Sequence, residues 1–456
     1  MADREAQDEA SRRQIAAQLE AIVSCGGDAA LVGPAALALH AELQPSTTML
    51  PEVIVRTSAA DVRRAIEARL AELEPVEIRW LDDEAKQPAL VADTRLVARL
   101  QRQPVRAWGL AVTADGAVHD PIGALPGIAR GELELSRGPR GMLRGRNDGA
   151  LRLAVWAAAT GLTPSTEATR LAEREASRVL GLDRAQWCTL FGEVLVGHRP
   201  SAGLRFLHQA RTLQIMLPEV VSMVDFHNSC PVHHKDIWDH TLQVVDKCPP
   251  SLVVRWSALM HDVGKVWTRS IGAGGKVHFF RHEEMSASLM EGAAARFHLG
   301  AETRDRVLYV IANHARVNVY GTEWTDGAVR RLIRDLGDHL EDVVTFSQCD
   351  FTTRRAWRIA EVRRLATELD ERIAHIQAED ARPKVLPKGL GNLIMAATGL
   401  PGGPWLGRIQ RWLEDEAEAG RIDAGLEADA CLDHVRSHAP ELLPSDESPA
   451  ASSVSG

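Results

Sequence analysis

The chain has 456 residues, of which 45% are hydrophobic and 25% are charged, and its formal net charge is −9. These values describe a globular protein of roughly two to four domains. The negative charge excludes a protein that coats nucleic acid with its whole surface, although it allows a local basic patch. The six cysteines show no Cys-x-x-Cys spacing, which predicts free thiols. A charged N-terminus and the lack of a long apolar run predict a cytoplasmic protein without a membrane span.

The first part of the chain alternates predicted strands with predicted helices. The strands are expected at residues 29–32, 52–55, 76–80 and 107–113, with a turn at Asp115-Gly116 after the last one. The helices are expected at residues 5–23, 35–43 and 61–72. This order predicts a small α/β head that ends near residue 135. Further along, apolar residues recur at helical spacing, so we expect a protein that is mainly α-helical.

Arginines alternate with glycines just after the predicted head. They include Arg137, Arg140, Arg144, Arg146 and Arg152. Glycine lets another molecule approach the backbone closely, and arginine pairs well with phosphate. Two interpretations stay open here: a basic loop that contacts solvent only, or a surface that contacts a nucleic-acid backbone or another phosphate group.

An adjacent histidine and aspartate, His261 and Asp262, follow an apolar run that predicts the buried end of a helix. Neighbouring helix positions lie about 100° apart, so both side chains can reach one ion. Imidazole and carboxylate together suit a divalent metal, and Lys265 close by suits a phosphate. The dipeptide alone is weak evidence, because His119-Asp120 occurs in a predicted turn without comparable partners.

More histidines and one further aspartate end or interrupt apolar helical stretches of the same region. The predicted metal ligands are His240, His261, Asp262, His282, His314 and Asp350. Each of these groups is costly to bury without a partner, so one shared site explains them better than separate core positions do. One ion would be held by His240, His261, Asp262 and Asp350. His282 and His314 would complete a second ion, since two-metal sites hold ions ~3.5–4 Å apart.

Several motifs resemble known proteins when they are taken in order. His240, His261-Asp262 and Asp350, with Gly264-Lys265 after the pair, resemble the HD-domain phosphohydrolase superfamily. The wider context is similar to the bacterial tRNA nucleotidyltransferases, or CCA-adding enzymes, that carry an HD domain. The segments that carry this second resemblance are 120–123, 150–162, 182–184, 203–207, 233–242, 260–269, 280–283, 386–389 and 402–408.

The resemblance implies a fold of four parts and a tail. A small nucleotidyltransferase-like sheet domain, similar to that of polymerase β, precedes an all-helical neck, an HD domain and C-terminal helices. The expected bounds are 1–135 for the head, 136–222 for the neck with its arginine-rich loop, 223–375 for the HD domain, 376–439 for the C-terminal helices and 440–456 for the tail. The tail is rich in Pro, Ser and Glu, so we expect it to be disordered.

The head departs from the family's pattern at its functional motifs. The family's Gly-Gly turn with a following Arg-Asp pair is replaced by the segment 33–38, and its catalytic Asp-x-Asp is replaced by Glu52-Val53-Ile54. Isoleucine offers no oxygen to a magnesium ion. Of the neck's nucleotide-binding set, Arg152 and Arg184 remain. We therefore predict a degenerate head that is inactive in nucleotidyl transfer.

The HD motifs are complete, so we expect the activity to lie there. The expected function is that of a metal-dependent phosphohydrolase or phosphodiesterase that acts on a nucleotide or an RNA-end phosphoester. The metal would lower the pKa of a bound water, with Asp262 at the reacting centre. Lys265 and Arg269 would neutralise the phosphoryl oxygens. The resemblance implies one or two ions of nickel, manganese or magnesium.

Two other functions stay open. One is a non-catalytic regulator that binds RNA or nucleotides through the arginines, and the other is nucleotidyl transfer to tRNA 3′ ends. tRNA is thus a further expected partner. The sequence leaves the substrate, the ion and the oligomeric state undecided.

Overall fold

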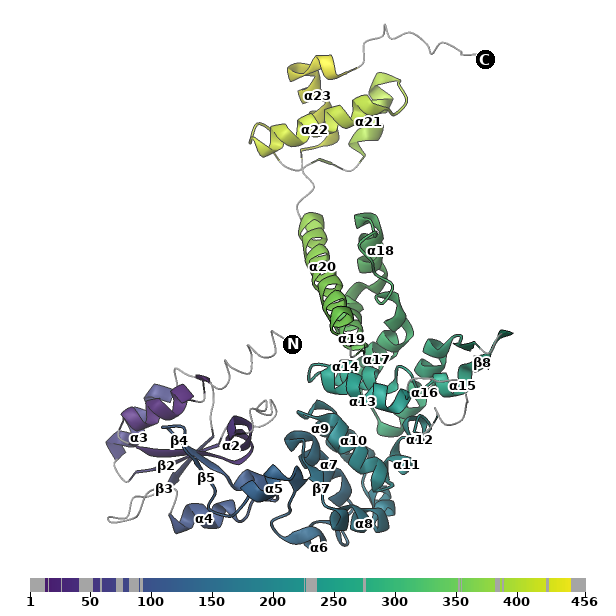
Figure 1. Cartoon of the computed structure of the whole chain (residues 1–456). Helices are drawn as coiled ribbons and strands as arrows, with labels where there is room; N and C mark the ends of the chain where they lie inside the picture. Colours follow the sequence, from purple (N-terminus) through teal and green to yellow (C-terminus); the bar gives the residue numbers. More distant parts are fainter. Residues whose placement is uncertain are drawn as a thin grey trace. The chain divides into compact units, whose positions relative to one another are not determined.

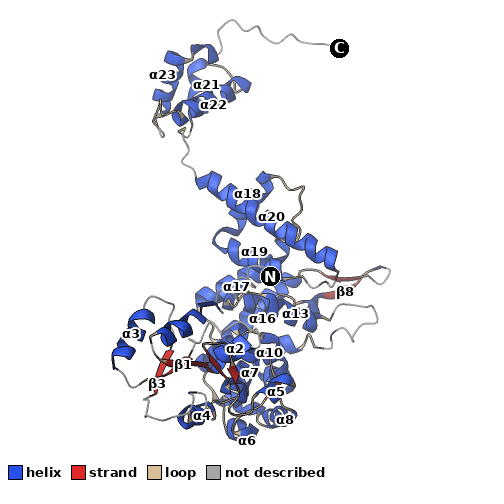
Figure 2. Ribbon diagram, turned by 60° about the vertical axis from the view of Figure 1, so that its left-hand side comes forward, coloured by secondary structure: helices blue, strands red, loops and turns tan. Residues whose placement is uncertain are grey.

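The computed structural model describes most of the chain. The described residues are 13–14, 16–25, 27–40, 52–57, 60–70, 77–81, 90, 93–224, 226, 236–273, 276–351, 353, 355–381, 386–387, 389–423 and 426–443. The start of the first predicted helix, the motif residues 233–235 and the tail beyond residue 443 lie outside them. Within the described residues, the predicted fold class is confirmed: the chain is mainly helical and has a small mixed sheet near its N-terminus (Figures 1 and 2).

The head is built on a five-stranded sheet with the order β3-β2-β1-β4-β5. Its strands are β1 (Asp28–Val32), β2 (Glu52–Arg56), β3 (Glu77–Leu81), β4 (Ala111–Thr113) and β5 (Val118–His119). β1 runs antiparallel to both β2 and β4, whereas β2 and β3 run parallel and place Glu52 opposite Glu77. Strand β2 carries the apolar residues Val53, Ile54 and Val55, all fully buried, as expected for a central strand with both faces covered.

Helices cover the sheet and supply the rest of the head's core. They are α2 (Gly33–His40), α3 (Ala60–Leu70) and α4 (Thr94–Leu100). Leu96 and Leu100 of α4 pack with Ile54 of the sheet. α4 begins at Asp93, whose side chain accepts a hydrogen bond from the backbone N–H of Arg95. β1, α2, β2, α3 and β3 follow one another in the predicted order, whereas α4 was not predicted from the sequence.

One predicted strand is mostly wrong. Of residues 107–113 only Ala111–Thr113 form a strand, whereas Arg106–Gly109 form a 3-10 helix (η2). Trp108 is buried there and packs edge-to-face on Trp156 at 6.1 Å between ring centroids. Gly109 lets Ile122 come so close that a Cβ on residue 109 would lie 2.0 Å from the Ile122 side chain. Tertiary packing of these residues overrides their strand propensity.

The neck consists of short helices and one very short pair of strands, β6 (Glu132–Leu133) and β7 (Thr163–Pro164). Its helices are α5 (Leu125–Ala129), α6 (Gly138–Leu143), α7 (Gly149–Thr160), α8 (Thr166–Arg174), the 3-10 helix η3 (Ala176–Gly181), α9 (Arg184–Val196), α10 (Pro200–Gln209), α11 (Thr212–Met216) and α12 (Pro218–Val221). α7 packs on both α9 and α10. Gly203 allows α10 to pack closely on α7, because a Cβ there would lie 2.6 Å from the carbonyl oxygen of Ala154.

The histidine-rich region forms a compact group of helices. They are α13 (Ile237–Lys247), α14 (Leu252–Met260), α15 (Lys265–Thr268), α16 (His282–Phe297), α17 (Ala301–Asn313) and α19 (Leu340–Cys349), and the hairpin β8 (Arg269–Ile271) and β9 (Val277–Phe279) follows α15. Phe191 from the neck packs on Trp256 and Phe297 at centroid distances of 5.1 and 5.2 Å. This aromatic cluster joins the neck to the histidine-rich helices.

The chain divides into two compact units, residues 1–323 with 333–366 and residues 324–332 with 367–456. The second unit has a core of its own, built by α21 (Leu390–Thr398), α22 (Pro404–Glu418) and α23 (Ala428–His438). Two helices, α18 (Asp326–Leu336) and α20 (Ala356–Ala381), contribute residues to both units. The finer division into head, neck, HD domain and C-terminal helices stays a prediction.

The start of the predicted tail is wrong. Pro440–Leu442 form a 3-10 helix (η8), and Leu442 and Leu443 pack on the core of the second unit because both are apolar. Among the described helices, none is both long and apolar enough to cross a membrane. The cellular location stays a prediction.

Candidate functional site

The predicted metal ligands come from helices that are far apart in sequence. His240 lies within α13, His261 and Asp262 follow α14, His282 begins α16, His314 follows α17 and Asp350 follows α19. Each lies in or next to an amphipathic or apolar helix whose packing turns these side chains inward, and five of the six are less than 12% exposed. The structure therefore brings together all the side chains that the sequence singled out as ligands.

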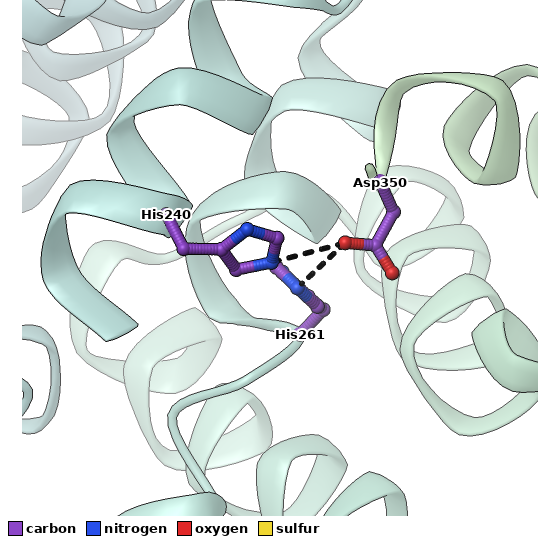
Figure 3. A group of neighbouring side chains, drawn as sticks. All are labelled: His240, His261 and Asp350. Carbon is purple, nitrogen blue, oxygen red and sulfur yellow. Dashed lines mark ion pairs between the residues drawn. The ribbon is translucent and has the colours of Figure 1, made fainter. Parts of the chain in front are cut away.

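The first of two ligand groups consists of His240, His261 and Asp350 (Figure 3). One donor atom from each of these residues lies within 4.8 Å of the others. Nε2 of His240 is 3.1 Å from Oδ1 of Asp350, and Nε2 of His261 is 3.4 Å from the same oxygen. Two imidazole nitrogens and a carboxylate oxygen that converge in this way form a donor set for a divalent ion.

The second ligand group consists of Asp262, His282 and His314. Nε2 of His282 lies 3.6 Å from Oδ1 of Asp262. The other carboxylate oxygen of Asp262 lies 3.3 Å from Nε2 of His261, in the first group. Asp262 therefore faces both groups, whereas the sequence analysis assigned it to the first ion alone. A carboxylate in this position can bridge two ions.

Three histidines are held in one orientation by the backbone. Nδ1 of His261, His282 and His314 lies 2.9, 3.0 and 2.7 Å from the carbonyl oxygen three residues earlier. A carbonyl only accepts, so each Nδ1–H donates and each Nε2 faces the centre, where it can ligate an ion once it carries no proton. Nε2 of His261 is buried and makes no hydrogen bond within the described part of the chain. A bound ion would satisfy it.

Gly264 positions the start of α16 against the end of α14. A Cβ on residue 264 would lie 2.4 Å from the carbonyl oxygen of His282, and the N–H of Gly264 donates to Oγ of Ser286 at 2.8 Å. A glycine just after an apolar helical run is commonly a helix stop. The helix ends earlier, at Met260, so close approach of two backbones is the reason for the glycine.

The charges of the ligands are strongly coupled. Burial by itself would lower the pKa of His261, but the carboxylates of Asp262 and Asp350 outweigh it and raise the pKa to about 10. Burial lowers the pKa of His314 to about 4, and it also lowers the pKa of His240 and of His282. Without an ion, one cationic imidazole thus compensates the two carboxylates.

The two predicted phosphate-binding cations lie in different surroundings. Nζ of Lys265 is 2.7 Å from the Asp262 carboxylate, and burial of that carboxyl is outweighed by His261 and Lys265, which hold its pKa well below its usual range. Arg269 begins β8, and its guanidinium lies 4.5 Å from the centre of the Phe226 ring. The structure thus brings Lys265 to the ligands and stacks Arg269 on an aromatic ring.

The predicted phosphate-binding arginines of the neck fall into two kinds. Arg146 and Arg152 both pair with Asp148, and Arg184 lies over the Trp187 ring at 4.0 Å. The others, Arg137, Arg140 and Arg144, are exposed, and no ion pair of theirs occurs among the described residues. Only this second kind presents an uncompensated guanidinium to solvent.

One carboxylate of the head was not predicted from the sequence. Glu77 lies opposite Glu52 on the neighbouring parallel strand, so both side chains leave the sheet on the same face. Arg79 contacts both carboxylates, with its Nε 3.6 Å from Oε1 of Glu52, and Arg99 also pairs with Glu52. Glu77 lay within the strand predicted at 76–80, but the pairing of that strand with the one that carries Glu52 could not be inferred from the sequence.

No protein-family model matches the chain. It is 30% identical over 247 residues to the CC-adding tRNA nucleotidyltransferase of Thermus thermophilus, a match that covers 52% of this chain and 54% of that protein. It is 26% identical over 217 residues to the A-adding tRNA nucleotidyltransferase of Deinococcus radiodurans, covering 46% and 48%. The chain is related to the bacterial tRNA nucleotidyltransferases. The chain spans about half the length of these relatives.

A third relative and a solved structure extend the comparison. The chain is 26% identical over 291 residues to the Multifunctional CCA protein of Dechloromonas aromatica, covering 58% of this chain and 66% of that protein. The CCA-adding enzyme of Bacillus stearothermophilus in complex with CTP matches 94% of this chain and 98% of its own, with 12% identity and a TM-score of 0.46. The predicted resemblance to the tRNA nucleotidyltransferases is confirmed by the sequence relatives.

These relatives overturn the predicted function. Two of them are named as transferases that add nucleotides, and none of the three names describes a phosphohydrolase. The prediction of a phosphohydrolase or phosphodiesterase with an inactive transferase head is therefore wrong. Its physical argument counted carboxylates along a single strand, with Ile54 in place of the second aspartate, and did not include Glu77 on the neighbouring strand.

Proposed function

We propose that the chain adds nucleotides to the 3′ ends of tRNA. The observation that carries this proposal is its 30% identity over 247 residues to a CC-adding tRNA nucleotidyltransferase. An A-adding enzyme is among the other relatives, so the proposal covers C addition, A addition or both. The alternative of a non-catalytic RNA-binding regulator would use the same arginines, and turnover distinguishes the two.

The head offers two carboxylates for this reaction. Glu52 and Glu77 lie at the same register of neighbouring parallel strands and share Arg79 as an ion-pair partner. Magnesium is commonly held by one or two protein carboxylates together with the phosphates of a substrate. We assign Glu52 and Glu77 to an ion that enters with the nucleoside triphosphate. In its absence, Arg79 and Arg99 compensate their charge.

The neck offers the cations that a tRNA backbone requires. Arg137, Arg140 and Arg144 lie on and beside the short helix α6, and all three are exposed. Arginine at such positions contributes affinity for phosphates without a preference for sequence. We assign these three residues to the tRNA backbone. We expect Arg146 and Arg152 to contribute less to tRNA binding, because Asp148 already compensates their charge.

We further propose that the two ligand groups of the helical region hold one or two divalent ions. Four of the six ligands are imidazoles, which favours nickel over manganese or magnesium. Such an ion supplies positive charge between Asp262 and Asp350 and ties together helices that are distant in sequence. Nothing in the transfer reaction is assigned to it. Its expected effect is on the stability and geometry of this region.

The transfer proposal is tested by incorporation of labelled CTP and ATP. Three tRNA acceptors are used: one that lacks the CCA end, one that ends in C and one that ends in CC. We expect the protein with magnesium to extend at least one of them. Glu52→Gln and Glu77→Gln should each lower the rate by roughly 100-fold, because each removes a ligand of the ion that would stabilise the transferred phosphate.

The matched control is Glu67→Gln, an exposed carboxylate of α3 in the same head, which should leave the rate unchanged. Failure of the wild type to extend any of the three acceptors would refute the proposal. Extension that survives both Glu52→Gln and Glu77→Gln would leave transfer in place but remove these carboxylates from it.

A further inference from the structure

A polar pocket opens in the neck, away from both ligand groups. Its volume is about 420 Å³, which lies within the range of small-molecule sites in proteins. It lies where the segment before α7 meets the end of α8 and the 3-10 helix η3. The residues that line it are Asn147, Arg174, Glu175, Ser177, Arg178 and Gly181.

One cation of the pocket is uncompensated. Arg174 ends α8, its side chain is exposed, and it makes no ion pair or hydrogen bond within the described residues. Arg178 pairs with Glu175, and this pairing together with the backbone N–H of Gly145 lowers the pKa of Glu175. The only carboxylate of the lining is therefore already compensated. Arg174 leaves the pocket with a net positive charge.

Neutral polar groups complete the lining. The side-chain amide nitrogen of Asn147 donates to the carbonyl oxygen of Gly181 at 3.2 Å, which holds the amide against η3. Its amide oxygen stays an acceptor, and the hydroxyl of Ser177, an exposed residue, can both donate and accept. A guanidinium beside such groups matches a phosphate attached to a sugar with free hydroxyls.

We propose that this pocket binds a phosphorylated ribose unit of an RNA backbone. Arg174 pairs with the phosphate, Arg178 flanks it, and Asn147 and Ser177 hydrogen-bond the sugar. The proposal rests on the proposed function for the identity of the RNA, which is then tRNA. Arg144 lies close enough to act electrostatically on Glu175, so the pocket continues the basic surface of the neck.

The test uses Arg174→Gln in the full-length protein and measures the binding of labelled tRNA by fluorescence anisotropy over a series of salt concentrations. Loss of one phosphate contact should weaken binding and lower the slope of log K against log salt by about 1. Arg174→Lys should restore most of both, because it keeps the charge. Arg170→Gln removes a charge from the same helix outside the pocket, and its salt slope should match that of the wild type.

The proposal is overturned if Arg174→Gln and the wild type bind tRNA with equal affinity and equal salt slope. It is also overturned if Arg170→Gln loses as much tRNA affinity and salt slope as Arg174→Gln. CTP binding is measured in parallel. If Arg174→Gln weakens CTP binding and leaves tRNA binding unchanged, the pocket takes a free nucleotide and the RNA proposal is wrong. Absence of nucleotide incorporation by the wild type, together with a lower slope for Arg174→Gln, would refute the proposed function and leave the pocket standing.

Discussion

Gly264 controls the geometry of the second ligand group. Because Gly264 has no side chain, the first turn of α16, which begins at His282, can pack directly against its backbone. The ligands themselves could be predicted from the sequence, because imidazoles and carboxylates recur at the ends of apolar helices. The role of Gly264 could not, since a backbone contact between residues 264 and 282 leaves no mark in the pattern of either segment.

We predict that Gly264→Ala lowers the stability of the protein by about 1–3 kcal/mol and weakens metal binding. The added Cβ would lie 2.4 Å from the carbonyl oxygen of His282, so the start of α16 must shift. Gly292→Ala, within α16, is the matched control, since a Cβ there meets nothing within 4 Å. It should be neutral or stabilising by about 0.5–1 kcal/mol. Chemical denaturation and metal titration of both variants measure these effects, and equal behaviour would contradict the role of Gly264.

The pKa of His261 predicts how metal binding depends on pH. In the ion-free protein this imidazole is protonated at pH 7, because the neighbouring carboxylates raise its pKa to about 10. An ion must displace that proton, so the apparent affinity should rise by about tenfold per pH unit from neutral pH toward pH 10. The other three histidines have lowered pKa values and add no further proton release above neutral pH.

Calorimetric titration of manganese or nickel in two buffers with different heats of ionisation measures the released protons. We expect about one proton per bound ion at the first group. His261→Ala should lose both the tight binding and the proton release. Tight binding with no dependence on pH between 7 and 9 would contradict this assignment of charges.

At the scale of elements, a buried arginine joins the neck to the histidine-rich helices. Arg255 of α14 is 1% exposed, and its guanidinium donates to the carbonyl oxygens of Leu195, Gly197 and Cys248. These carbonyls end helices α9 and α13, where intrahelical partners run out. One side chain thus caps two helix ends from within a third helix.

We predict that Arg255→Met destabilises the protein by about 3 kcal/mol, because it leaves buried carbonyl oxygens without donors. Arg358→Met is the control, an exposed arginine of α20, and it should change stability by less than about 0.5 kcal/mol. Urea denaturation of both variants measures the difference. If the two variants had equal free energies of unfolding, the guanidinium of Arg255 would make no net contribution to stability.

Helices and strands differ in how far the sequence predicts them. The helices around the ligands follow the spacing of apolar residues, and α14 ends at Met260, directly before the predicted position of His261 and Asp262. The prediction of a strand at residues 107–113 was mostly wrong. Contacts of Trp108 with Trp156 and of Gly109 with Ile122 determine the backbone there, rather than local propensity. The pairing of β2 with β3 also had no local signal, and it is this pairing that brings Glu77 to Glu52.

At the scale of the whole molecule, a carboxylate-bearing head and a histidine-rich region occur in the same compact unit. From the sequence, we expected all activity to lie in the part with complete motifs. Two of the relatives are named as tRNA nucleotidyltransferases. Complete ligand groups in the histidine-rich region are therefore no evidence that the head is inactive. The central claim is therefore nucleotidyl transfer to tRNA.

Mass spectrometry of the tRNA 3′ end after incubation with the protein, CTP, ATP and magnesium tests this claim most directly. One spectrum distinguishes an end that has gained a nucleotide from one that is unchanged and from one that has lost a phosphate. We predict a gain of cytidylate, adenylate or both, which disappears in Glu52→Gln and persists in Glu67→Gln. An end that stays unchanged, or that loses a phosphate without gaining a nucleotide, would contradict the claim.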